Sequence, residues 1–156
     1  MLKAVIIFLL YIMSISNTYA QKIYRGNSPY SSDIVCTYEQ GKVYRGKSTY
    51  SSNVIARFDG TNLYRGNSSY NSDILMSLHN GKIYKGHSKY DSDVLATWRE
   101  NKFYRGSSPY QSDVLFTYKD NKVYRRNGSY QSDVLLTTSS WVHPLILYLL
   151  IIPCNE

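Results

Sequence analysis

A unit of twenty residues repeats six times between Lys22 and Trp141, and this strict period constrains the fold more than any other feature of the 156-residue chain. One copy reads KFYRGSSPYQSDVLFTYKDN, and the six copies begin at Lys22, Lys42, Asn62, Lys82, Lys102 and Lys122. A fixed period of this kind is typical of proteins in which each unit buries its apolar surface against its neighbours. We therefore expect one repeat domain over residues 22–141.

Several columns of the repeat hardly vary from copy to copy. The third position is always tyrosine, at Tyr24, Tyr44, Tyr64, Tyr84, Tyr104 and Tyr124. The ninth is also always tyrosine, at Tyr30, Tyr50, Tyr70, Tyr90, Tyr110 and Tyr130. The fourth is always basic, at Arg25, Arg45, Arg65, Lys85, Arg105 and Arg125. A glycine follows the basic residue in five copies, and Arg126 replaces it in the sixth.

Each repeat encodes two short strands. The segment Lys-apolar-Tyr-Arg alternates and is rich in β-branched and aromatic residues, and the apolar run 34–38 and its analogues indicate a second strand with both faces covered. The links between repeats contain Gln40-Gly41, Asp59-Gly60, Asn80-Gly81, Glu100-Asn101 and Asp120-Asn121. Such pairs favour type I′ turns, which need positive φ at both central residues. The second strand of each repeat is therefore expected to form a hairpin with the first strand of the next.

We interpret the twelve repeated tyrosines as structural. In a stack of repeats each ring would pack against its copy in the next unit, and aromatic pairs add about 0.5–1.5 kcal/mol beyond the area they bury. The alternative is that the tyrosines bind a ligand. Exposure of the rings separates these two interpretations.

The pattern Lys-Ile-Tyr-Arg-Gly-x-Ser-x-Tyr-x-Ser-Asp-Val-Leu resembles the bacterial β-flower family, known from the "4-fold beta flower" domain, over residues 22–138. The resemblance implies an all-β fold of hairpins arranged radially around an axis. It implies no enzymatic activity, and no catalytic or ligand residue is carried over from it. This chain departs in having six copies rather than four, and in the sixth copy Gly128 also replaces a serine.

We expect the six β-hairpin repeats to form a closed or nearly closed flower, with an open β-hairpin solenoid as the alternative. Closure removes exposed sheet edges, which promote aggregation. An open stack needs atypical capping units, whereas the first repeat is ordinary and starts close to the expected mature N-terminus. The irregular sixth copy argues in the opposite direction.

Residues 1–20 have the layout of a secretory signal peptide. A single early cation, Lys3, precedes an apolar run over residues 4–13, and Thr18 and Ala20 occupy the positions that a signal peptidase reads. We expect export to the periplasm or the medium of a bacterium, with the mature chain beginning at Gln21. The alternative is an uncleaved membrane anchor.

Residues 142–156 form an apolar C-terminal tail. Residues 145–152 are apolar throughout and lie between Pro144 and Pro153, but they are too few to span a bilayer as a helix, which needs about 20. Three roles remain open for the tail: a plug or cap on the flower, insertion into a membrane surface, or a contact between copies in a homo-oligomer.

The formal net charge is +7, but the cations are distributed evenly rather than clustered, so we expect no nucleic-acid partner. A basic exported protein favours anionic envelope polymers or a membrane surface. Of the two cysteines, Cys36 occupies an otherwise apolar column and is expected in the core, and pairing with Cys154 is the alternative.

The repeat provides six similar places instead of the asymmetric set of groups that catalysis needs, and no phosphate loop, nucleophile elbow or metal-ligand spacing is present in the sequence. We expect neither an enzyme nor a cofactor or metal site. The first hypothesis is an exported structural scaffold; the second is a multivalent binding module for envelope glycans or another anionic polymer. In the second, the ligand contacts would come from the repeated basic residues and from the variable positions Asn27, Lys47, Asn67, His87, Ser107 and Asn127.

Overall fold

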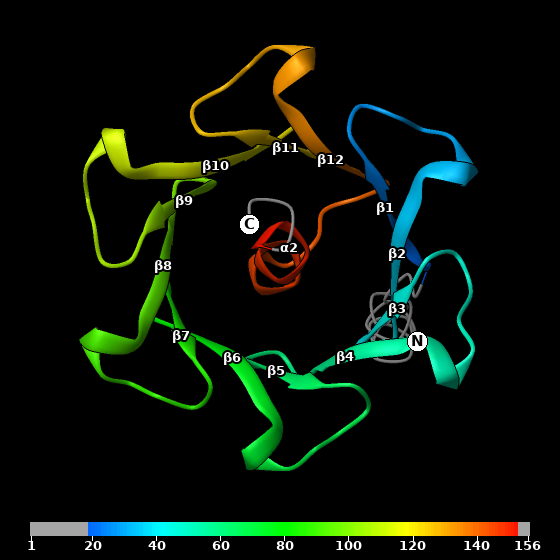
Figure 1. The fold of residues 1–156 in the computed structure, drawn as a ribbon, viewed down its shortest axis with the longest axis horizontal. Coiled ribbons are helices and arrows are strands. Elements are labelled where there is room, and N and C mark those ends of the chain that lie inside the picture. The colour runs from blue at the N-terminus through cyan, green and yellow to red at the C-terminus, as the bar shows by residue number, and fades with distance from the viewer. Residues whose placement is uncertain (1–18, 153–156) are drawn as a thin grey trace, which may run out of the picture.

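The computed structural model describes residues 19–152 and contains twelve short antiparallel strands around a central helix (Figure 1). The strands are β1 (Gln21–Arg25), β2 (Ile34–Glu39), β3 (Lys42–Arg45), β4 (Val54–Phe58), β5 (Asn62–Arg65), β6 (Ile74–His79), β7 (Lys82–Lys85), β8 (Val94–Arg99), β9 (Lys102–Arg105), β10 (Val114–Lys119), β11 (Lys122–Arg125) and β12 (Val134–Thr138). Each repeat supplies two strands, as its two apolar segments predict.

The sheet closes on itself. Every strand pairs with its neighbours in the chain, and β1 also pairs with β12, where Ile23 lies opposite Thr138. The fold is therefore the closed flower expected from the sequence, and the open solenoid is wrong. Closure leaves no unpaired strand edge among the described residues, which removes the usual route to edge-to-edge aggregation.

Tight turns join successive repeats as the sequence predicts. The pair Gln40-Gly41 has φ values of 49° and 75°, and the other pairs with positive φ at both positions are Asn80-Gly81, Glu100-Asn101 and Asp120-Asn121. Positive φ at both central residues is what a type I′ turn requires. These four turns lie together at one end of the barrel, which we call the turn end.

The link between β4 and β5 is a different turn from the one expected at Asp59-Gly60. Asp59 Oδ1 accepts hydrogen bonds from the backbone N–H groups of Thr61 (2.9 Å) and Asn62 (2.7 Å), and Oδ2 accepts one from the Tyr64 hydroxyl (2.8 Å). Partial burial favours the neutral carboxyl, but these hydrogen bonds favour the carboxylate and lower its pKa to about 2. The type I′ prediction is wrong here because the aspartate side chain organises a longer loop around Gly60.

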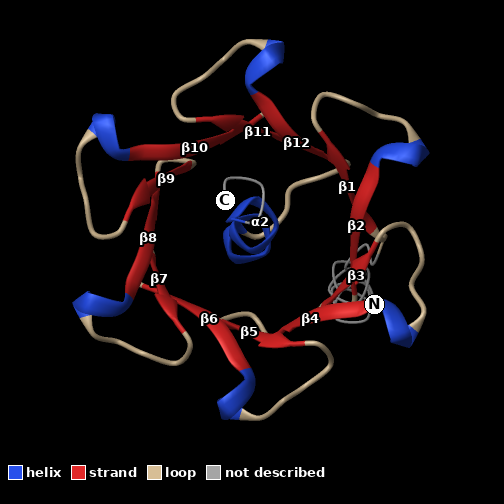
Figure 2. Ribbon diagram, viewed as in Figure 1, coloured by secondary structure: helices blue, strands red, loops and turns tan. Residues whose placement is uncertain are grey.

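The long links within the repeats form six petals at the outer edge of the ring (Figure 2). Each petal contains one turn of 3₁₀ helix: Ser31–Asp33, Ser51–Asn53, Asn71–Asp73, Asp91–Asp93, Gln111–Asp113 and Gln131–Asp133. The petals leave the barrel at the end opposite the turns, which we call the petal end. They fold back along the outer wall, where Arg99 of β8 donates to the Pro109 carbonyl (3.2 Å) and Lys82 pairs with Asp91 (2.8 Å).

Two apolar columns line the inside of the ring. The strands of one repeat pair so that Ile23 lies opposite Cys36, and a bulge follows at Tyr24. The inward columns are Ile23, Val43, Leu63, Ile83, Phe103 and Val123, and Cys36, Ala56, Met76, Ala96, Phe116 and Leu136. All twelve side chains are buried, and together with the central helix they form one core.

The apolar tail fills the ring as helix α2 (Pro144–Ile151), which lies on the axis (Figure 1). Leu145, Ile146, Leu147 and Ile151 are fully buried. A helix that is apolar on every side is stable only when it is surrounded, and here the inward columns surround it. Of the three roles left open for the tail, the structure shows the plug.

Helix α2 enters the ring at the turn end and finishes at the petal end. His143 begins it, with Nδ1 accepting from the Leu145 N–H (3.2 Å) and its ring 4.4 Å from that of Phe58. Further along, the Tyr148 hydroxyl donates to the Leu95 carbonyl (3.3 Å), and Leu150 lies beside Arg25 near the petal end. The plug therefore crosses the whole depth of the barrel.

Two expectations fall partly outside the described residues. The signal peptide, residues 1–20, lies mostly before residue 19. Cys36 is a buried thiol whose pKa burial raises to about 11, whereas Cys154 is not among the described residues. Between residues 19 and 152, no helix has the length and apolar character needed to cross a membrane.

Candidate functional site

The second tyrosine column lies on the surface. These six rings, at Tyr30, Tyr50, Tyr70, Tyr90, Tyr110 and Tyr130, are 69–77% exposed. Each stands in extended backbone immediately before the 3₁₀ turn of its petal. The expectation that these tyrosines stack on their copies is wrong, because the petals radiate from a common axis and their tips diverge (Figure 2).

A short hydrogen-bond network holds the backbone of each tyrosine. In the fourth repeat the Ser88 hydroxyl donates to the Asp93 carboxylate (2.5 Å) and accepts from the Tyr90 N–H (3.2 Å). The same pair of bonds occurs in the first, third and fifth repeats. The repeated aspartate thus anchors a serine of its own petal.

Four members of the first tyrosine column, Tyr44, Tyr64, Tyr84 and Tyr104, are buried, in agreement with the structural interpretation, and Tyr24 and Tyr124 are half-buried. The contacts of these rings differ from those expected. Tyr64 and Tyr104 lie on the outer wall beneath the petals, and Arg57 and Arg99 lie over their rings at 5.4 and 4.8 Å from the ring centroids. The ring of Tyr84 contacts that of His79. These rings therefore pack against side chains of the adjacent strand and not against the next tyrosine of the column.

The repeated basic residues face the axis at the petal end. Arg45 lies opposite Cys36, and Arg125 lies opposite Phe116. Residues directly opposite in an antiparallel pair share a face, so these cations leave the same face as the buried core columns. All six, Arg25, Arg45, Arg65, Lys85, Arg105 and Arg125, are exposed. We call this set the basic ring.

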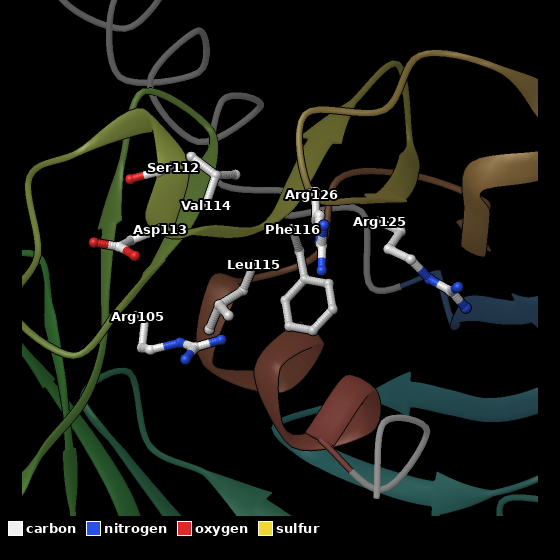
Figure 3. Close-up of a pocket in the computed structure, with 8 residues that line it drawn as sticks. All are labelled: Arg105, Ser112, Asp113, Val114, Leu115, Phe116, Arg125 and Arg126. Carbon is white, nitrogen blue, oxygen red and sulfur yellow. The ribbon is translucent and has the colours of Figure 1, made fainter.

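Clefts lie between two pairs of neighbouring members of the basic ring. One cleft, of about 340 Å³, lies between Arg25 and Arg45, and another, of about 540 Å³, lies between Arg105 and Arg125. In the larger one Arg105 and Phe116 point toward α2, while the Asp113 carboxylate points the opposite way (Figure 3). The repeat thus brings basic groups from successive units to one cleft.

The basic ring has no carboxylate partner within residues 19–152. The one ion pair of that part of the chain joins Lys82 to Asp91 on the outer wall. Asp113, the acidic residue lining the larger cleft, accepts the Ser108 hydroxyl at 2.5 Å. The basic ring therefore concentrates positive charge, and the described part of the chain supplies little negative charge to neutralise it.

The variable positions after the glycine, Asn27, Lys47, Asn67, His87, Ser107 and Asn127, are all exposed at the start of their petals. Sequence reasoning placed them beside the repeated basic residues. It missed the exposure of the ninth-position tyrosines. The signal was available, because the residues on either side of these tyrosines are polar or proline and vary from copy to copy.

A closed ring of twenty-residue hairpin units around an axis defines the class of radial β-repeat proteins. Residues 23–149 match the family described as 6-fold beta flower protein, and the chain belongs to that family. The six copies of the repeat agree with the six-fold architecture in this description, and the β-flower resemblance noted in the sequence is confirmed. No curated protein and no solved structure matches the chain.

Proposed function

We propose that this protein is an exported, non-enzymatic binding module whose petals hold an envelope glycan through the exposed tyrosines. The observation that carries the proposal is a side chain that never varies although it is not buried. The position before each tyrosine is Pro, Thr, Ser or Lys, and the position after it is Ser, Asn, Asp or Gln. Copies have diverged on both sides of the tyrosine and not at it, which packing does not explain.

The chemistry around each ring suits a sugar. An exposed aromatic face packs against the C–H groups of a sugar ring, while hydroxyl and amide groups beside it bond the sugar hydroxyls. Tyrosine also loses little side-chain entropy on binding, since it has only two χ angles. The serine–aspartate network fixes the backbone at the ring, so that little order has to be gained when a ligand binds.

Six such sites on a rigid ring favour a polymeric ligand. A single exposed ring with a few polar neighbours binds weakly, but linked sites raise the overall affinity by about 10²–10⁴ through effective concentration. The closed barrel keeps the six petals at fixed positions, so the sites can engage one polymer or join several. The scaffold hypothesis accounts for the rigid body and leaves the invariant exposed rings without a role.

The test is retention on bacterial envelope polysaccharides, compared between the parent and a Tyr50→Ala/Tyr70→Ala/Tyr110→Ala variant. The matched control, Thr49→Ala/Ser69→Ala/Pro109→Ala, alters the preceding residue of the same three petals. Because these side chains are exposed, each change should alter the free energy of unfolding by less than about 0.5 kcal/mol. We expect the tyrosine variant to lose most retention and the control to keep it. Retention by neither parent nor variant, or by both equally, would leave the scaffold hypothesis.

A further inference from the structure

The sixth repeat places an arginine where the fold requires glycine. Arg126 has φ 53°, in the left-handed region, and the glycines at this position in the other five repeats have φ between 50° and 67°. A residue with a Cβ is strained there by about 1–2 kcal/mol. Arg126 nevertheless makes the backbone bonds of a glycine, because its N–H donates to the Leu115 carbonyl (2.7 Å) and its carbonyl accepts from Thr117 (2.7 Å).

Strain of this kind persists where the side chain has a use. Arg126 lines the basic cleft of about 540 Å³ that also contains Arg105 and Arg125. Arg105, Arg125 and Arg126 all line that cleft at the junction of the fifth and sixth repeats, with Arg126 between the other two and the Arg125 guanidinium pointing away from them (Figure 3). The basic members of neighbouring repeats are two strands apart, or about 10 Å at their Cα atoms, which their side chains span easily.

We propose that this junction is a binding site for a phosphate-rich ligand, held by Arg105, Arg125 and Arg126. Guanidinium groups match phosphate oxygens through paired N–H donors. Three of them suit a group that carries more than one negative charge, which a terminal phosphate or a polyphosphate does at neutral pH and a carboxylate or a phosphodiester does not. The site is separate from the tyrosines of the petals and does not depend on their role.

The basic ring also stabilises the C-terminal end of helix α2, but this interaction uses little of its charge. That end of the helix lies near Arg25 at the petal end, and a helix C-terminus carries the equivalent of about half a negative charge. The ring carries six full charges and no carboxylate partner within the described residues. The charge left over repels itself, and an anion bound in the cleft would relieve that repulsion.

The test separates binding from folding by restoring the glycine. Arg126→Gly removes one guanidinium and also the backbone strain, so affinity and stability should move in opposite directions. We expect the purified protein to bind inorganic tripolyphosphate more tightly than orthophosphate by calorimetry. Arg126→Gly should weaken tripolyphosphate binding about tenfold while melting at the same temperature or higher. A structural arginine would show loss of stability instead.

Lys119→Gln is the matched control, because it removes one exposed positive charge at the turn end. It should change the affinity for tripolyphosphate less than twofold. Equal binding by Arg126→Gly and the parent would overturn the proposal, and so would an equal loss in the Lys119→Gln control. Absence of tripolyphosphate binding by the parent would overturn it as well.

Vesicles distinguish the two sources of phosphate. Sedimentation with vesicles of phosphatidic acid and phosphatidylcholine, lost in Arg126→Gly, would assign the cleft to a lipid headgroup. Tripolyphosphate binding without sedimentation would assign it to a soluble or polymeric phosphate. Sedimentation that is equal in the parent and in Arg126→Gly would place membrane binding elsewhere and contradict the lipid source.

Discussion

At the scale of the residue, the two tyrosine columns show what a repeat reveals and what it hides. Tyr104 and Tyr110 are both invariant between copies, yet one is fully buried and the other 69% exposed. Invariance alone does not separate packing from binding. The neighbours do, because Tyr104 stands in an alternating strand segment beside an apolar residue, whereas Tyr110 stands between Pro109 and Gln111, two turn positions that vary between copies.

The hydrogen bond between serine and aspartate in the petals predicts a stabilising substitution. Asn53 replaces the aspartate in the second repeat, and among the described residues it forms no hydrogen bond with Ser48, whose hydroxyl accepts only the Tyr50 N–H (3.4 Å). Asn53→Asp should restore the bond seen at Ser88 and Asp93. A hydrogen bond to a charged group adds about 1.5–3 kcal/mol at most, and partial exposure reduces this to about 1 kcal/mol.

Chemical denaturation of Asn53→Asp measures this difference. Asn67→Asp is the control, because it adds the same charge to an exposed residue of the next petal, away from the aspartate position. We expect the midpoint to rise for Asn53→Asp and to stay unchanged for Asn67→Asp. If both variants shift alike, the effect belongs to net charge and the local hydrogen bond contributes nothing.

At the scale of the element, the hairpins could be predicted from sequence and the petals only in part. Turn pairs such as Asn80-Gly81 and the short alternating strands specify the hairpins locally, so their prediction is confirmed. The single 3₁₀ turns are too short to leave a helical period in the sequence. The turn at Asp59 differed because side-chain bonds to Thr61 and Asn62 outweighed the preference of an Asp-Gly pair.

Helix α2 begins with a histidine cap, which predicts a pH-dependent element. Burial lowers the pKa of His143 below its ordinary value of 6.5, so the folded protein favours the neutral ring. The neutral Nδ1 also accepts the Leu145 N–H, which a protonated ring cannot do. The contribution of His143 to the free energy of unfolding is therefore complete above pH 6.5. It is lost as the pH falls through the lower pKa that His143 has in the folded state.

Melting curves between pH 7.5 and 5 check this expectation. His143→Asn keeps a good N-cap acceptor and removes the titrating ring, so its melting temperature should depend less on pH than that of the parent. His87→Asn, on an exposed petal, is the control and should keep the dependence of the parent. A parent that melts at one temperature across this range would contradict the role of His143.

At the scale of the whole molecule, closure followed from the sequence because identical units cannot end without exposing an edge. The plug could not be assigned from the sequence, since the composition of residues 145–152 also fits a membrane surface or an oligomer contact. What decided it is the space inside twelve strands, which small residues such as Ala56 and Ala96 leave open for a helix. Only the three-dimensional closure reveals that this space exists.

The plug also predicts that the number of repeats is fixed. Deleting residues 62–81 removes β5, β6 and one petal and joins Thr61 to Lys82 in the normal phase of the repeat, so every local hairpin is preserved. The smaller ring would no longer accommodate α2, whose Leu145, Ile146 and Leu147 are fully buried at present. In an open array the stabilities of units and interfaces are approximately additive, and one deletion removes only its own share.

The matched control moves the same twenty residues to the junction between Asn101 and Lys102, which keeps six repeats and the same composition. We expect this relocated variant to melt near the parent, since the repeats are interchangeable in register. The five-repeat deletion should lose several kcal/mol of stability or fail to fold, because α2 would no longer fit inside the ring. Each apolar side chain of α2 that becomes exposed loses about 1.5–3 kcal/mol of burial free energy. A five-repeat protein that melts cooperatively just below the parent would show that the hairpins close around α2 equally well at either number.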